Sequence, residues 1–236
     1  MGSGAQAAAQ VAKLVLLDSD FAGLPAVVAE GRRVINNIER SASLYLVKNI
    51  FSFLLSVLSI FWTMPYPLQP LQLTLISFIT IGVPSFYLAL EPNHDRIEGS
   101  FLRNVLREAF PGGLTNLGLI LGVEAFAYAF ALSGETLYTI ATIVLMAVGL
   151  LVLAEVSRPM DWQRGVLLGV MTALGIFSVT VLREAFELAL LDLQGALVLA
   201  VFLLLARPAM QFVLRGFEYG DRLIARLRSR RKKAAA

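Results

Sequence analysis

Polar side chains that could bind a cation lie within otherwise apolar stretches of this chain. Asn49 and Ser52 fall in the first long apolar stretch, Ser77 and Thr80 in the second, and Glu124 in the middle of the third. Amide, hydroxyl and carboxylate oxygens are the ligands that hard cations such as Ca²⁺ and Mg²⁺ prefer. A polar group at membrane depth is costly and usually faces a partner or a water-filled path. These five residues are therefore the candidate ion-binding residues.

Two charged residues within the apolar stretches leave alternatives open. Glu124 is either an ion ligand or proton relay, or a protonated carboxyl that donates a structural hydrogen bond to another helix. Lys48 is either part of a site or a boundary cation whose ammonium extends to the lipid headgroups.

Gly82 and Pro84 interrupt the second apolar stretch directly after Ser77 and Thr80. Proline has no N–H, so it leaves a backbone carbonyl without its helical partner. Broken helices of this kind bind ions in membrane transporters. The sequence therefore predicts a helix break at the ion site, with a packing kink as the alternative.

The composition predicts an all-α polytopic membrane protein. Apolar residues make up 57% of the 236 residues and charged residues 16%, whereas soluble proteins carry roughly 25% charged residues. Because a bilayer span needs about 20 apolar residues, we expect six transmembrane helices, at 44–63, 71–90, 114–132, 136–154, 165–182 and 193–214. The chain has no Cys and one His, His94, which excludes thiol catalysis and a multi-histidine zinc site. Membrane lipids are the expected surroundings, and nothing indicates a nucleic-acid partner.

The arrangement of charge predicts the topology. Arginines occupy the connection 91–112 and the connection around Arg158 and Arg164, and basic residues crowd the tail 215–236. Basic residues favour the cytoplasmic side of a membrane. Both termini are therefore expected in the cytoplasm, around a transport domain at 41–214.

Residues 1–40 are expected to form a short cytosolic α/β remnant. Residues 14–17 (LVLL) are typical of a short buried strand, followed by Asp18 and Asp20 as helix caps. No proline occurs between Pro25 and Trp62, so one helix of about 57 Å could run from the cytosol across the membrane. The alternative is a soluble stub followed by a separate first span. Residues 101–110 are expected to form an amphipathic helix at the cytoplasmic surface.

The first 93 residues resemble the end of the phosphorylation domain and the stalk of cation-transporting P-type ATPases. The resemblance rests on the loop MGSG, the segment LVLLDSDF, and a stalk motif in which Glu30, Gly31, Arg32 and Asn37 hold the family's places. The second apolar stretch, QLTLISFITIGVPSFYLALEPN, resembles the sixth transmembrane helix of the family. The remaining four spans would then correspond to the seventh to tenth helices.

The resemblance implies roles for some of these residues. Asn49 and Thr80 match metal-binding residues of the calcium-pump branch, on its fifth and sixth helices. Ser52, Ser77 and Ile81 stand where that branch has glutamate, asparagine and aspartate. The form TIGVPSF is similar to a bacterial branch of these pumps linked to calcium, so Ca²⁺ is the first choice for the transported ion.

The family's DKTGT, TGES and GDGxND motifs are absent from this sequence. We therefore expect a C-terminal part of a bacterial plasma-membrane pump that cannot hydrolyse ATP alone. It would hold no cofactor itself, and would need pump domains that bind Mg²⁺ and ATP, in cis or in trans. The alternatives are a self-standing six-span channel or carrier, and a membrane subunit of a split transporter.

Overall fold

The computed structural model describes residues 4–18, 20–61, 66–97 and 99–234, and within these ranges it is helical without any strand. Six of its helical segments are long and apolar enough to cross a membrane, which confirms the predicted membrane fold. The elements are α1 (Gln6–Val11), the 3₁₀ turn η1 (Phe21–Gly23), α2 (Leu24–Phe61), α3 (Pro70–Ser77), η2 (Phe78–Gly82), α4 (Val83–Ala89), α5 (Phe101–Ala129), α6 (Gly134–Val156), α7 (Trp162–Thr180) and α8 (Leu193–Ala234).

The strand predicted at 14–17 is wrong, and with it the α/β remnant. Residues 14–17 have no regular structure, and Leu14 and Leu17 are exposed. A strand must pair its backbone N–H and C=O groups with a neighbour, and no other strand occurs among the described residues. Asp20 does act as a cap, because its side chain accepts a hydrogen bond from the Ala22 N–H at the start of η1.

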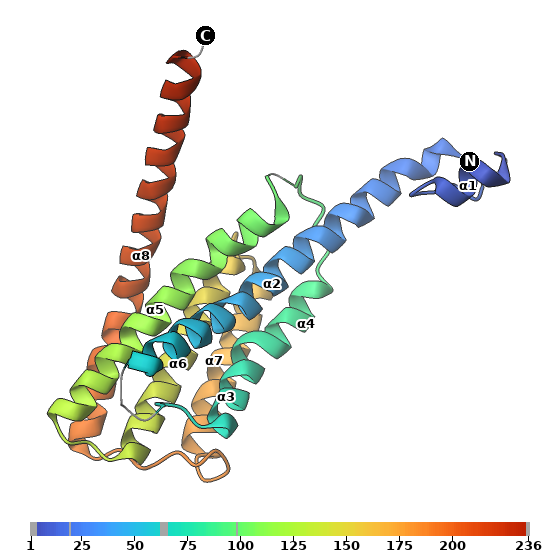
Figure 1. Ribbon diagram of the computed structural model, residues 1–236. Helices are drawn as coiled ribbons and strands as arrows, with labels where there is room; N and C mark the ends of the chain where they lie inside the picture. Colours follow the sequence, from blue (N-terminus) through green and yellow to red (C-terminus); the bar gives the residue numbers. More distant parts are fainter. Residues whose placement is uncertain (1–3, 19, 62–65, 98, 235–236) are drawn as a thin grey trace.

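Helix α2 is one continuous helix of 38 residues, about 57 Å long. This confirms the single long helix, although Trp62, its predicted last residue, lies outside the described residues. Pro25 stands in the first turn, where its missing N–H removes no helical hydrogen bond. The buried residues of α2 begin only at Asn37, so its first third projects beyond the bundle (Figure 1).

Residues 101–110 are helical as predicted, but they and the third span form one helix, α5. Pro111 lies inside it and removes a single helical hydrogen bond. Close packing compensates for that loss. A Cβ added at Gly113 would lie 2.7 Å from the Ile50 Cγ2 of α2, and one at Gly112 would lie 2.7 Å from the Val152 Cγ2 of α6. The two glycines therefore let α5 pack directly against both helices.

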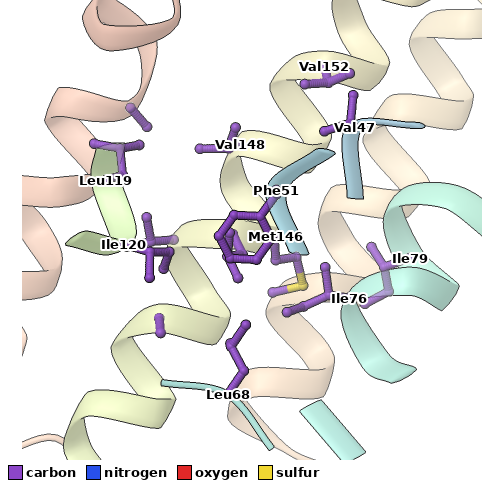
Figure 2. Packing of buried hydrophobic residues seen from close by; sticks show 14 of the residues in the cluster. Val47, Phe51, Leu68, Ile76, Ile79, Leu119, Ile120, Met146, Val148 and Val152 are labelled. Carbon is purple, nitrogen blue, oxygen red and sulfur yellow. The ribbon is translucent and has the colours of Figure 1, made fainter. Parts of the chain in front are cut away.

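The helices form a bundle with two long extensions. Figure 1 shows the beginning of α2 and the end of α8 projecting from the same end of the bundle, while the α5–α6 and α7–α8 connections lie at the other end. The core combines residues from α2, α5, α6 and the broken α3–η2–α4 segment, including Phe51, Ile79, Ile120 and Val148 (Figure 2). Close van der Waals packing of this kind is what holds helices together in lipid.

Candidate ion-binding site

The second span is broken where the sequence predicted it. Between α3 and α4, residues Phe78–Gly82 form a π-helical turn, and Pro84 follows in the first turn of α4. A π turn pairs each N–H with the carbonyl five residues earlier, and such turns are frequent at functional sites. Because Pro84 has no N–H, the carbonyl of Ile79 has no helical partner in this register. The break therefore supplies a backbone oxygen in the middle of the bundle.

A small cavity of about 30 Å³ lies beside this break, between α2, α3, η2, α5 and α6. A cavity needs at least about 10–15 Å³ to hold one water molecule, so this one has room for about two water-sized species. Its polar lining consists of Lys48, Ser77, Thr80 and Asn116. None of its lining residues is Asp or Glu.

Thr80 is held firmly against this cavity. Its side chain is buried, and its Oγ1 donates a hydrogen bond of 2.8 Å to the carbonyl of Ile76. On the opposite side, a Cβ added at Gly149 of α6 would lie 2.6 Å from Thr80 Cγ2 and 3.0 Å from Thr80 Oγ1. A hydroxyl that donates its proton keeps its lone pairs. Thr80 thus presents a fixed oxygen acceptor to the cavity.

The Lys48 side chain extends from α2 to α3. Its Nζ donates a hydrogen bond of 2.6 Å to Ser77 Oγ. Ser77 Oγ in turn donates to the carbonyl of Leu73 at 2.6 Å. Ser77 is therefore engaged with an ammonium group in this conformation, which favours Lys48 as part of a site, and the boundary-cation interpretation stays a prediction.

Asn116 of α5 was missed by the sequence reasoning. It is only 6% exposed, and its Oδ1 is buried without a hydrogen-bond partner among the residues that the structure describes. An amide within the third apolar stretch was a signal for it, but the charged Glu124, eight residues later, was the stronger candidate in that stretch. Unsatisfied buried acceptors are rare in proteins and require an explanation.

Asn49 and Ser52 do not line the cavity. Asn49 is exposed on the surface of α2. Ser52 is half-buried and hydrogen-bonded to the Tyr66 hydroxyl. Burial raises the pKa of the Tyr66 phenol, and the hydrogen bond from Ser52 partly opposes this rise. The structure thus brings Ser77 and Thr80 together and leaves Asn49 and Ser52 outside.

Glu124 lies further along α5 and is also outside the cavity lining. It is 8% exposed. It forms no hydrogen bond or ion pair with any residue in the described part of the chain. Both interpretations of this carboxyl group remain predictions.

Of the stalk residues, Asn37 makes the contacts that connect elements. Its Nδ2 donates to the carbonyl of Ala89, the last residue of α4, at 3.0 Å and to that of Glu91, just beyond the helix, at 2.8 Å. Glu30 pairs with Arg33 on the surface of the same helix. Gly31 and Arg32 are exposed, and a Cβ at Gly31 would meet nothing within 4 Å. The motif therefore joins α2 to the end of the broken span through its asparagine.

A buried ion-pair cluster at the same place was also missed. Glu91 accepts from Arg40 of α2 through one carboxylate oxygen and from Arg164 of α7 through the other, each at 2.6 Å. The three side chains are 8% to 12% exposed. Arg164 also donates to the carbonyls of Ser157 and Pro159 in the α6–α7 connection. The cluster ties the first, second and fifth spans together at one end of the bundle.

The sequence is similar to known cation pumps. The calcium-transporting ATPase CtpE of Mycolicibacterium smegmatis is 41% identical over 209 residues, which cover 80% of this chain and 26% of that protein. The probable cation-transporting ATPase exp7 of Streptococcus pneumoniae is 33% identical over 216 residues, covering 86% of this chain and 28% of that protein. The chain thus spans about a quarter of the length of these relatives. No protein-family model matches it.

Proposed function

The chain is related to the cation-transporting P-type ATPases over about a quarter of their length, and from this we propose that it is the C-terminal membrane part of such a pump. In this proposal α2 and the broken α3–η2–α4 segment contribute the ion pathway. The observation that carries it is the cavity beside the π-helical break, where Thr80 of η2, packed against Gly149 of α6, presents a fixed oxygen.

Ca²⁺ is our first choice for the transported ion. The names of the M. smegmatis and Bacillus subtilis relatives describe calcium-transporting ATPases. Oxygen ligands from a hydroxyl, an amide and a backbone carbonyl suit a hard cation. Because no carboxylate lines the cavity, the negative charge that a divalent ion needs must come from elsewhere. Asn49 could take part only from the exposed face of α2, which another part of the pump would have to cover.

We place the ATP-driven steps outside this sequence. The chain carries none of the family's phosphorylation or nucleotide-binding motifs, so the domains that bind Mg²⁺ and ATP would join it in cis or in trans. The protein would lie in a bacterial plasma membrane with both termini in the cytoplasm. Two observations support this orientation. Basic residues occupy the tail and the connections that are predicted to lie on the cytoplasmic side. Helices α2 and α8 project from the same end of the bundle (Figure 1).

The proposal can be tested in the complete pump that contains this segment. Thr80→Ala should lower the apparent affinity for Ca²⁺ in uptake of radioactive calcium into membrane vesicles about tenfold or more, because one ligand oxygen is lost. Thr74→Ala is the matched control. Its hydroxyl makes the same kind of hydrogen bond, to the carbonyl of Pro70, but it is exposed on α3. Unchanged calcium dependence in Thr80→Ala would contradict the proposed site.

A further inference from the structure

The cavity beside the π-helical break already contains a positive charge that its surroundings do not neutralise. Lys48 is the one charged residue in the cavity lining. Lys48 is half-buried, and an ammonium group held in a lining without a carboxylate needs hydrogen-bond acceptors instead. One acceptor is Ser77 Oγ, at 2.6 Å from Lys48 Nζ. The cavity that we assign to a transported cation is thus partly occupied by a cation belonging to the chain.

A second acceptor in the same cavity is unused. The Oδ1 of Asn116 is buried without a partner among the described residues, and Asn116 lines the cavity together with Lys48. A lysine ammonium has three donors on a flexible stem, and the hydrogen bond to Ser77 uses one of them. Asn116 thus supplies the kind of group that an ammonium or a metal cation requires, and it comes from a helix that the sequence reasoning had not assigned to the site.

The cavity is too small for both cations. About 30 Å³ accommodates about two water-sized species. Two like charges inside so small a volume repel strongly in a low-dielectric interior. Lys48 has a long side chain, whereas Thr80 is fixed by Ile76 and by the backbone of Gly149. Of the polar groups in the cavity, the ammonium of Lys48 is the one that can leave.

We propose that Lys48 is a displaceable internal cation, whose ammonium stays at the cavity on Ser77 until a transported cation enters and binds the Asn116 and Thr80 oxygens. This inference rests on the proposed function. It adds Asn116 as a ligand from α5, and it makes cation entry and the departure of Lys48 a single exchange.

The full 236-residue chain offers a direct probe, because it has four lysines: Lys13, Lys48, Lys232 and Lys233. Lysine labelled with ¹³C at Cε is incorporated during expression, the protein is placed in lipid nanodiscs, and the Lys48 signal is assigned with Lys48→Arg. Asn116→Leu should shift the Lys48 signal, because an apolar side chain then replaces an amide dipole in the lining of the same cavity. Gln211→Leu, which removes an exposed amide of α8 outside the cavity lining, is the control and should leave it unchanged. An unchanged chemical shift of Lys48 in Asn116→Leu would overturn the assignment of Asn116.

Addition of CaCl₂, with KCl and NaCl in separate samples, then tests the exchange. Retention of radioactive calcium is measured on the same samples, in wild type and in Thr80→Ala. Calcium retention that moves the Lys48 signal, and that Lys48→Met strengthens about tenfold or more by removing a like charge, supports the exchange. Retention that is lost in Thr80→Ala but leaves Lys48 unmoved would overturn the exchange and keep the proposed cation site. No retention of calcium in wild type or in Lys48→Met, together with a Lys48 signal in wild type that none of the three salts shifts, would count against the cation site itself.

Discussion

Glu91 is the carboxylate partner of two arginines from different helices, Arg40 and Arg164, so its substitution should affect the stability of the bundle. We expect Glu91→Gln to lower the free energy of unfolding by about 3–5 kcal/mol, the usual result of removing one partner from a buried ion pair. Arg40 and Arg164 would then face each other without a counter-charge. Thermal unfolding in detergent, followed by circular dichroism, measures the effect. Glu135→Gln at the exposed start of α6 is the control, and equal stability of the two variants would contradict the role of the cluster.

Gly149 gives a second prediction at the residue scale. A methyl group at this position would overlap with Thr80 Cγ2, so Gly149→Ala should cost about 1–3 kcal/mol, as overpacking usually does. The same substitution at Gly169 of α7, where a Cβ meets nothing within 4 Å, should be neutral or stabilising by up to about 1 kcal/mol. Thermal unfolding of the pair separates the two sites. A Gly149→Ala variant as stable as Gly169→Ala would show that η2 can move away from α6.

Residue types alone could predict part of the candidate site. Ser77 and Thr80 were found because they precede a visible Gly/Pro break, and the structure places both at the cavity. The orientation of a residue around a helix was not predictable from one sequence. Lys48 faces the cavity while its neighbour Asn49 is exposed, because successive residues of a helix point about 100° apart. Asn116 was hidden for the same reason, since only packing shows which way an amide points.

Helix α2 is the element whose continuity matters most, and Gly31 is its weakest position. Gly31→Ala should stabilise the helix by about 0.5–1 kcal/mol, because the added methyl group meets no neighbour. Gly31→Pro should break it by removing a hydrogen bond and adding a clash. Spin labels on Ala26→Cys and Tyr45→Cys, in a chain without other cysteines, report the result. We expect a narrow distance distribution near 28 Å along the axis, narrower in Gly31→Ala and broad in Gly31→Pro.

An equally broad distribution in the parent and in Gly31→Pro would contradict a continuous α2. Continuity itself was predictable for α2, because the sequence shows no proline from residue 26 to residue 61. It was not predictable for α5, where Pro111 and the adjacent glycines look like a helix end. The glycines instead let α5 pack against α2 and α6, and this tertiary contact outweighs the local preference.

At the scale of the whole molecule, the projection of α2 and α8 from one end predicts that the two ends of the chain share one side of the membrane. Gln6→Cys and Arg222→Cys, both exposed in the structure, should react with a membrane-impermeant maleimide from the same side of sealed vesicles. Glu135→Cys lies in the first turn of α6, next to the α5–α6 connection at the opposite end of the bundle (Figure 1), and should react only from the other side. Labelling of all three from one side would contradict the topology.

The overall membrane architecture was the most predictable level, because apolar stretches of about 20 residues leave few alternatives to spanning helices. The N-terminal segment was the least predictable. Residues 14–17 have the composition of a strand, but strand formation depends on a partner elsewhere in a protein, and the described residues include none.

The attachment of Asn37 to the end of α4 gives α2 the geometry of a lever. From Leu24 to Asn37 the outer arm is about 20 Å long, and from Asn37 to Lys48 the inner arm is about 17 Å. His94 Nδ1, 3.0 Å from the Ala29 carbonyl, contacts the outer arm. The arms are nearly equal, and the Glu91 cluster beside Asn37 holds the pivot. A sideways push on the outer end would therefore act on the Lys48 end through this pivot, against the packing of Val47 and Ile50 on α5.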